Sequence, residues 1–332
     1  MTICVSKWFK LGLIVLLTFS FIVACSGTNS QTSQPNSSAS PSAECRTIQH
    51  KAGETCVPND LQRVVVLDRG LLANAIALGV QPVGSVRKAT VSSFEFPVYL
   101  QSKVNDSLES VGTQTQPNLE KILQLQPDLI LGFNFGIDYD KLSQIASTVI
   151  IEWQDTAHWK EHFQIAAEAM GKSEKAEQLL ANYHRRIEEL KAAIESPEEL
   201  EISLAYIGGN TPFIRSDVKN SFPGSILEDV GLGRPPSQDI VHRNHQIEVS
   251  QEMIPSLDGD VLFLFSVNDE QGKETWNKLK NHPIWQKLDV VKNEQVYLVD
   301  FETWRMHNIL AANGVIDDLF KYLVERKVER VN

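Results

Sequence analysis

Short, unbroken apolar runs recur along the chain, and most of them are rich in Val, Ile and Leu. Such runs are typical of strands that are buried on both faces, because a half-exposed strand would alternate polar and apolar residues. The pattern predicts strands at 63–67, 83–86, 128–132, 148–152, 202–207, 260–266 and 295–299. Apolar residues at helical spacing predict helices at 70–78, 118–125, 221–230 and 275–288. Since strands and helices alternate, we expect an α/β fold with mainly parallel sheets.

One predicted helix, 174–195, is much longer than the others and lies in the middle of the chain. Its apolar stripe consists of Leu179, Tyr183, Ile187, Leu190 and Ile194. These positions fall on one face of a single helix, which Pro197 ends. Three to four predicted strands lie on either side of it. We therefore expect two lobes joined by one long helix.

The two halves of the chain also resemble each other. The segment 118–131 aligns with 250–263 at a constant offset of 132 residues, so that Glu120 corresponds to Glu252 and Asp128 to Asp260. In both segments a short helix precedes a tight turn and a strand that starts at Asp. An internal repeat of this kind indicates two similar Rossmann-like lobes.

The first 24 residues resemble a lipoprotein signal peptide. Lys7 and Lys10 precede the uncharged apolar run 11–23, which is too short to span a membrane. The run ends at Cys25 in a pattern that resembles a bacterial lipobox, so we expect cleavage before Cys25 and its lipidation. The alternative is an ordinary signal peptide with an incidental cysteine. Either interpretation places the protein in the periplasm or cell envelope.

Residues 25–44 are polar and rich in Ser, Thr, Asn, Gln and Pro, which predicts a disordered tether. Beyond it we expect an N-terminal lobe at 45–155, a connecting region with the long helix at 156–197, and a C-terminal lobe at 198–332. The formal net charge of −11 makes nucleic acid a poor partner, although a local basic pocket remains compatible with it.

Cys45 and Cys56 remain once Cys4 is removed with the signal peptide and Cys25 is lipidated. Export favours a disulfide between them. A metal pair and a redox pair are the alternatives, but the spacing lacks the CxxC pattern.

Ligands of open parallel sheets bind outside the carboxyl ends of the strands. Several Arg and aromatic residues follow the predicted strands, and these residue types suit a bulky, partly anionic small molecule. The candidate ligand contacts are Arg69, Arg87, Gln114, Phe135, Trp153, Arg215, Arg243, Trp304, Arg305 and His307. Within the turn 300–308 (DFETWRMHN), we expect Trp304 to form a wall of the cleft and Arg305 to contact an anion.

Signatures of enzymes are missing from the sequence, which contains no G-x-S-x-G, Walker or H-E-x-x-H motif. We therefore expect a binding protein and not an enzyme. His242 and His245 form an H-x-x-H pair, and His158 and His162 are four residues apart. The first pair lacks Cys or carboxylate partners at a recognised spacing, and the second lies in a stretch that reads as an ordinary amphipathic helix face, so we expect no metal site.

The chain resembles the ABC-importer substrate-binding proteins for ferric siderophores, haem and cobalamin. The resemblance rests on VVVLD (64–68), LGVQPVGSV (78–86), VGTQTQPNLEKILQLQPDLILG (111–132), SILEDVGL (225–232) and VDFETWRMHNILAANGVIDDLF (299–320). The segment 45–58 is similar to the entry segment of the ferric-siderophore branch. The resemblance implies a lipid-anchored monomer that delivers a ferric siderophore, of hydroxamate or citrate type, to an ABC permease with a cytoplasmic ATPase.

The resemblance also implies roles for particular residues. One exposed Glu on each lobe docks onto the permease in this family, and the motifs point to Glu120 and Glu228. The internal repeat offers Glu252 in place of Glu228. Iron would enter only as part of the bound siderophore, so no other cofactor is expected. Haem or cobalamin is the alternative ligand, and a directly bound metal ion is a further one. The Arg-Met-His at 305–307 departs from the small residues usual in the family, and we expect selectivity to lie there.

Overall fold

The computed structural model describes residues 45–88, 95–208, 213–266 and 269–325, all within one compact unit, 43–332. The predicted signal peptide, Cys25 and the tether lie outside the described residues. Among the residues that the structure describes, no helix has the length and apolar character needed to cross a bilayer.

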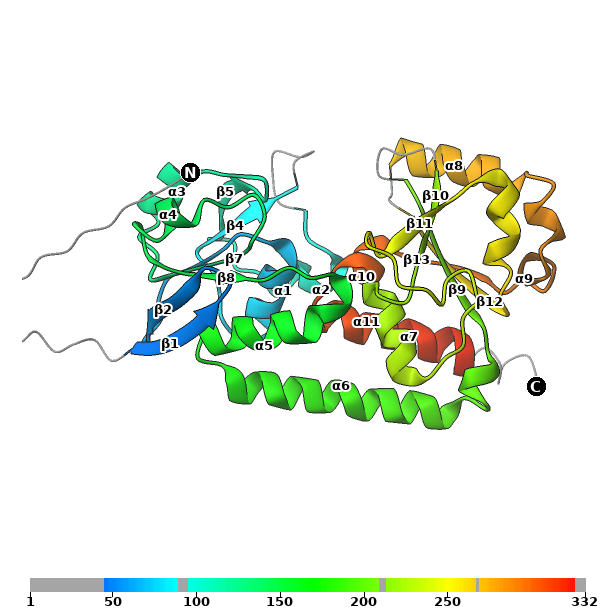
Figure 1. The fold of residues 1–332 in the computed structure, drawn as a ribbon, viewed down its shortest axis with the longest axis horizontal. Coiled ribbons are helices and arrows are strands. Elements are labelled where there is room, and N and C mark those ends of the chain that lie inside the picture. Colours follow the sequence, from blue (N-terminus) through cyan, green and yellow to red (C-terminus); the bar gives the residue numbers. More distant parts are fainter. Residues whose placement is uncertain (1–44, 89–94, 209–212, 267–268, 326–332) are drawn as a thin grey trace, which may run out of the picture. The chain divides into compact units, whose positions relative to one another are not determined.

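The N-terminal lobe contains a six-stranded sheet in the order β6-β5-β4-β3-β7-β8 (Figure 1). Its strands are β3 (Val64–Val66), β4 (Gly84–Arg87), β5 (Glu109–Thr113), β6 (Gln116–Pro117), β7 (Leu129–Phe133) and β8 (Ser147–Ile151). All neighbours are parallel except β6, which is antiparallel to β5. A hairpin of β1 (Cys45–His50) and β2 (Gly53–Pro58) precedes this sheet and contacts β8. The Cys45–Cys56 disulfide joins its two strands, which confirms that prediction.

The C-terminal lobe contains a five-stranded sheet in the order β11-β10-β9-β12-β13. Its strands are β9 (Ile202–Ile207), β10 (Ile214–Asp217), β11 (Gln246–Val249), β12 (Val261–Ser266) and β13 (Val296–Asp300). Strands β9, β12 and β13 are parallel, but β10 and β11 are antiparallel to their neighbours. The predicted α/β class is therefore confirmed, while a wholly parallel second sheet is not observed.

Helices cover both faces of each sheet. The α-helices are α1 (Arg69–Ala77), α2 (Val98–Gln101), α3 (Leu119–Gln124), α4 (Tyr139–Leu142), α5 (Trp159–Ala169), α6 (Ser173–Ala193), α7 (Phe222–Val230), α8 (Glu270–Lys280), α9 (Asp289–Lys292), α10 (Phe301–Arg305) and α11 (Ile309–Leu319). Short helical turns are η1 (Thr156–His158), η2 (Pro197–Glu199), η3 (Gln251–Leu257), η4 (Trp285–Lys287) and η5 (Phe320–Glu325). The predicted helix 275–288 corresponds to α8, but its bounds are wrong, because Asp269 caps an earlier start and Pro283 follows the end at Asn281.

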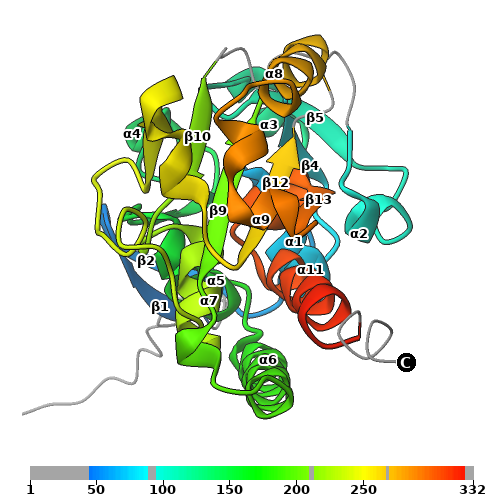
Figure 2. The same ribbon diagram turned by 90° about the vertical axis from the view of Figure 1, so that its right-hand side faces the viewer.

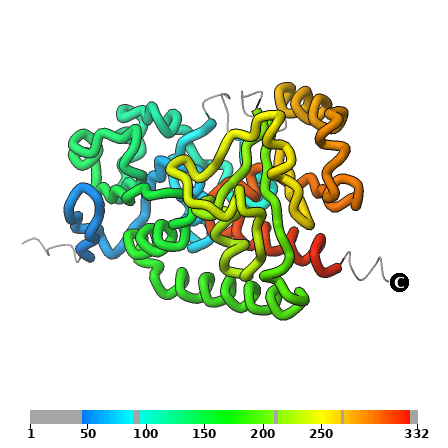
Figure 3. Tube along the Cα trace, turned by 45° about the vertical axis from the view of Figure 1, so that its right-hand side comes forward, coloured from blue at the N-terminus to red at the C-terminus, as the bar shows by residue number. Residues whose placement is uncertain are grey.

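The long predicted helix is α6, and it connects the two lobes (Figure 3). Tyr183, Ile187 and Leu190 on its apolar stripe are buried. Figure 2 shows the end of α6 close to α11, and the two helices are in contact. One apolar cluster contains residues from β3, β7 and β8, from β9, β12 and β13, and from α1, α5, α6, α7 and α11. Because both lobes share this core, we expect the lobes to move little relative to each other.

The structure supports the internal repeat. Asp128 precedes β7, and its side chain accepts hydrogen bonds from the backbone N–H groups of Gln62 and Arg63 at 2.6 and 3.0 Å. Asp260 precedes β12, and its side chain accepts one from the Glu201 N–H at 2.8 Å. In each lobe this Asp therefore fixes the start of the adjacent strand, β3 or β9. The helix before it is α3 in one lobe and η3 in the other, so Glu120 and Glu252 occupy equivalent positions.

Candidate ligand-binding site

Asp68, Gln114 and Arg87 lie at or just beyond the carboxyl ends of strands in the N-terminal lobe. Asp68 follows β3 and is buried, and its Oδ1 accepts a hydrogen bond from the Leu71 N–H at 2.9 Å, which caps α1. Its Oδ2 accepts a hydrogen bond from Gln114 Nε2 at 2.7 Å. Gln114 therefore reaches this region, but its amide binds Asp68. Arg87 ends β4, and its Nη1 donates to the carbonyl oxygen of Lys88 at 3.1 Å.

An aromatic cluster lies beside Asp68 and contains residues from both lobes. Trp153 packs edge-on against Phe133 (5.0 Å between ring centroids), Phe135 (5.4 Å) and His307 (4.9 Å). Trp153 also stacks on His162 at 5.5 Å. The structure thus brings together three of the candidate ligand contacts, Phe135, Trp153 and His307. Phe135 and Trp153 remain partly exposed, so they can offer aromatic surface to a ligand.

His307 fits closely against the start of α1. A Cβ atom placed on Gly70 would lie 3.1 Å from both His307 Cε1 and Asp68 Oδ1, so a larger residue would require these side chains to shift by a few tenths of an ångström. Burial lowers the pKa of His307, and the charge of Asp68 opposes that effect. Burial also lowers the pKa of His162 to about 4, with the charges of His307 and His158 acting in the same direction. His162 is therefore neutral at neutral pH.

On the C-terminal lobe, Arg305 and Arg215 both contact Tyr206. Arg305 lies over the Tyr206 ring at 4.5 Å, and its Nη1 forms an ion pair with Asp217. Arg215 Nη1 donates to the Tyr206 hydroxyl at 2.9 Å, and the hydroxyl in turn donates to Gln246. The anion that Arg305 contacts is thus Asp217 of the protein itself. This corrects the prediction that Arg305 contacts an anion in the ligand cleft.

Trp304 does not form a wall of the cleft, so this prediction is wrong. Its side chain is completely buried and stacks on Phe263 at 4.7 Å and on Phe265 at 5.9 Å. Its indole N–H donates to Asp318 Oδ2 at 2.8 Å. The reason is local: residues 301–305 form the helix α10, and Trp304 lies on its inner face, where it packs against β12.

Two predicted residues remain, Arg243 and Arg69. Arg243 is exposed in the loop before β11. Arg69 forms an ion pair with Glu302 of α10 at 2.7 Å, and Lys88 forms another with the same carboxylate at 2.6 Å. Sequence reasoning missed Glu302 and Asp217 as partners of the predicted cations. No local pattern signalled either pairing, because each acidic partner lies far along the chain from its cation.

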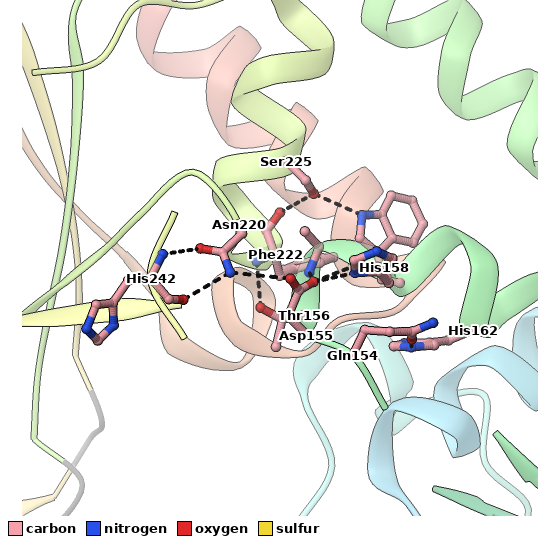
Figure 4. A network of polar contacts seen from close by, with 11 residues as sticks. Gln154, Asp155, Thr156, His158, His162, Asn220, Phe222, Ser225 and His242 are labelled. Atoms are coloured by element: carbon pink, nitrogen blue, oxygen red, sulfur yellow. Dashed lines mark hydrogen bonds and ion pairs between the residues drawn. The ribbon is translucent and has the colours of Figure 1, made fainter. Parts of the chain in front are cut away.

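A second set of polar contacts ties the chain leaving β8 to the C-terminal lobe (Figure 4). Thr156 Oγ1 accepts a hydrogen bond from the Phe222 N–H at 2.9 Å, and Asn220 Nδ2 donates to Asp155 Oδ2 at 3.3 Å. Burial raises the pKa of Asp155, but hydrogen bonds from His158 and Asn220 outweigh it and lower the pKa overall. This crossing segment is therefore held at the N-terminal end of α7.

The predicted docking residues differ in their surroundings. Glu120 is exposed in the first turn of α3. Glu228 is exposed on α7 but forms an ion pair with Lys219 at 3.3 Å. Glu252 is exposed on η3 and accepts a hydrogen bond from Ser250 at 2.9 Å. Within the described part of the chain, no three His, Cys, Asp or Glu side chains are grouped so that they could hold a metal ion.

The fold and the two-lobed arrangement of this region define a class of solute-binding proteins. The model of the family described as periplasmic binding protein matches residues 64–303, so the chain belongs to that family. Its members bind and deliver solutes for transport and are not enzymes.

Two curated proteins of Bacillus subtilis (strain 168) are similar along nearly their whole length. The "Probable siderophore-binding lipoprotein YfiY" is 31% identical over 94% of this chain and 99% of its own. The "Fe(3+)-citrate-binding protein YfmC" is 30% identical over 92% and 94%. Among solved structures, Staphylococcus aureus SirA complexed with staphyloferrin B has a TM-score of 0.73 and 28% identity, covering 84% of this chain and 98% of that one.

Proposed function

We propose that this protein is an extracytoplasmic lipoprotein that captures a ferric siderophore between its lobes and delivers it to an ABC permease. The observation that carries the proposal is that a partly exposed aromatic surface and a pair of cations both follow the carboxyl ends of strands in the N-terminal sheet. Trp153 and Phe135 supply the aromatic surface, and Arg69 and Lys88 supply the positive charges. A ferric siderophore presents apolar or ring surfaces and oxygen-rich, often anionic groups, which such side chains bind.

The relatives support the siderophore class and do not favour haem or cobalamin. Their names specify siderophore or ferric citrate binding, and the cationic pair suits carboxylate groups best. In a ferric siderophore the chelator supplies every ligand of the iron. The protein therefore has no need of a metal site of its own, and no further cofactor is proposed.

Fluorescence titration tests this function, because Trp153 lies at the proposed contact surface. We expect quenching by ferric citrate or by a ferric hydroxamate, and a Trp153→Phe variant should lose most of the signal change. A matched control is Trp276→Phe, which removes a tryptophan from α8 in the C-terminal lobe. Quenching by cobalamin or haem, together with no response to any ferric chelate, would exclude the siderophore function.

Docking to the permease would use one exposed carboxylate on each lobe. Glu120 is the candidate on the N-terminal lobe. On the C-terminal lobe, Glu252 occupies the position equivalent to Glu120, whereas Glu228 is paired with Lys219. We therefore favour Glu252 over Glu228, although the motif comparison pointed to Glu228.

The docking proposal is tested by single alanine variants at these positions, measured for ferric chelate binding and for iron uptake by cells. We expect Glu120→Ala and Glu252→Ala to bind normally and to lose uptake, and Glu228→Ala to retain both. Uptake that is lost only in Glu228→Ala would instead assign docking to Glu228, as the motif comparison indicated. Unchanged uptake in all three variants would reject docking through these carboxylates.

A further inference from the structure

Glu302 lies between two cations that belong to the other lobe. It is in the first turn of α10, which follows β13 of the C-terminal lobe. Its Oε2 accepts from Arg69 Nη2 at 2.7 Å, and its Oε1 accepts from Lys88 Nζ at 2.6 Å. Each carboxylate oxygen thus binds one cation of the N-terminal lobe.

These three side chains are more covered than an ordinary surface ion pair. Their exposed fractions are 17% for Glu302, 21% for Arg69 and 30% for Lys88. For comparison, Glu189 and Arg185 form an ion pair on α6 with side chains that are 52% and 58% exposed. Because solvent screens covered charges less, the attraction between Glu302 and its two cations is screened less than that of the α6 pair.

The two cations stand where a ligand of this fold binds. Arg69 begins α1 directly after β3, and Lys88 follows the end of β4. A small hollow adjoins them and is also lined by Phe96, Tyr99 and Met306. A carboxylate brought to these strand ends would therefore meet the two cations that Glu302 already occupies.

The backbone that carries Glu302 is fixed to the N-terminal lobe. The Ile309 N–H donates to Asn74 Oδ1 of α1 at 3.2 Å, and Asn308 Nδ2 donates to the Tyr99 hydroxyl at 3.2 Å. Asn74, Asn308 and Ile309 are buried. Since this junction is buried and hydrogen-bonded, the backbone that carries Glu302 stays close to both cations, and a rotation of its side chain is enough to release them.

We propose that Glu302 is a selectivity residue, an internal carboxylate that holds Arg69 and Lys88 in the empty protein and is exchanged for a carboxylate of the ligand. The proposal rests on the siderophore-binding function proposed above. Glu302 lowers the summed charge of Arg69, Lys88 and itself from two to one, and Glu95 lies 3.6 Å from Lys88 as well. A ligand must therefore compete with a carboxylate already in place. The residue therefore weakens the binding of carboxylate ligands in general and favours those that can replace both of its contacts.

The test uses Glu302→Gln, which keeps the shape of the side chain and removes its charge. The variant removes the competing carboxylate from the partly buried cations Arg69 and Lys88. We therefore expect its affinity for ferric citrate to rise roughly five- to tenfold. Affinity for the neutral complex ferrichrome should change by less than about twofold, since it carries no carboxylate to exchange. Glu189→Gln is the matched control, because it removes the same charge from an ion pair on α6.

A second variant separates charge exchange from an altered structure. Adding Lys88→Gln to Glu302→Gln should reverse the gain for ferric citrate, since it removes one of the released cations. Unchanged or weaker binding of ferric citrate by Glu302→Gln, in a wild-type protein that binds a ferric chelate, would overturn this inference alone. A wild-type protein that binds no ferric chelate would instead reject the proposed function.

Discussion

Replacing Arg305 with Met tests whether this residue stabilises the C-terminal lobe or binds the ligand. Asp217 at the end of β10 is completely buried, and its Oδ1 binds Arg305. Its Oδ2 has no hydrogen-bond partner in the described structure. Arg305 itself is only 25% exposed. The substitution would leave a buried carboxylate without its principal partner.

The magnitude follows from these surroundings. Removing one member of a buried ion pair typically costs about 3–5 kcal/mol. Arg234 reduces the loss, because its Nη2 donates to the backbone oxygen of Asp217 and its charge remains close. Burial lowers the pKa of Arg234 to about 10, so it stays charged at neutral pH. The lost contact with the Tyr206 ring adds about 1 kcal/mol, so we expect a total of roughly 3 kcal/mol.

The assay is urea unfolding of the mature protein, followed by circular dichroism. Arg305→Met should lower the free energy of unfolding by roughly 3 kcal/mol, and adding Asp217→Asn should restore most of it, because the buried charge is then gone. Arg185→Met on exposed α6 should cost less than about 1 kcal/mol. An Arg305→Met protein of wild-type stability that no longer binds ferric chelates would refute this account and return Arg305 to the ligand site.

Three further predictions concern the cleft, its histidine and the hairpin. Trp153→Ala should weaken ferric siderophore binding by roughly 10- to 30-fold, as expected for loss of a large aromatic contact, and calorimetric titration would measure it; an unchanged affinity would remove Trp153 from the site. Burial lowers the folded-state pKa of His162 to about 4, so the folded protein favours the neutral imidazole. The free energy of unfolding should therefore fall by at most about 3 kcal/mol as the pH decreases from 6.5 to 4. Unfolding curves of His162→Gln should lack this decline, and an equal decline in both proteins would assign it to other groups. Reducing the Cys45–Cys56 disulfide should lower stability by roughly 2–3 kcal/mol, since it closes a short loop, and a melting temperature insensitive to reductant would contradict this.

The sequence predicted those parts of the fold that depend on local pattern. Continuous apolar runs identified β3, β7, β9 and β12, because these strands are buried on both faces. The antiparallel strands β10 and β11 were missed, since they are short and mix polar with apolar residues. Trp304 was misplaced for a related reason: a five-residue helix leaves too little periodicity to distinguish its inner face from its outer one.

Pairing between charges was the part of the site that the sequence could not supply. Arg69 and Glu302 are 233 residues apart, and Arg305 and Asp217 are 88 apart. No local pattern links such residues, so each cation could only be judged by its position at a strand end. That criterion selected an edge of the first sheet at which Trp153 and Phe135 lie close to His307 or to each other, and Gln114 lies close to Asp68.

The central claim, that this protein recognises iron only as a chelate, is tested most directly by calorimetric titration of the mature protein with three solutions. These are ferric citrate, citrate without iron, and a ferric salt held soluble by a weak, exchangeable ligand. The account predicts binding of a ferric chelate with a Kd below about 1 μM and far weaker binding of citrate alone or of iron alone. Tight binding of iron without a chelator, or no binding of any ferric chelate across a panel of hydroxamate and carboxylate siderophores, would contradict it.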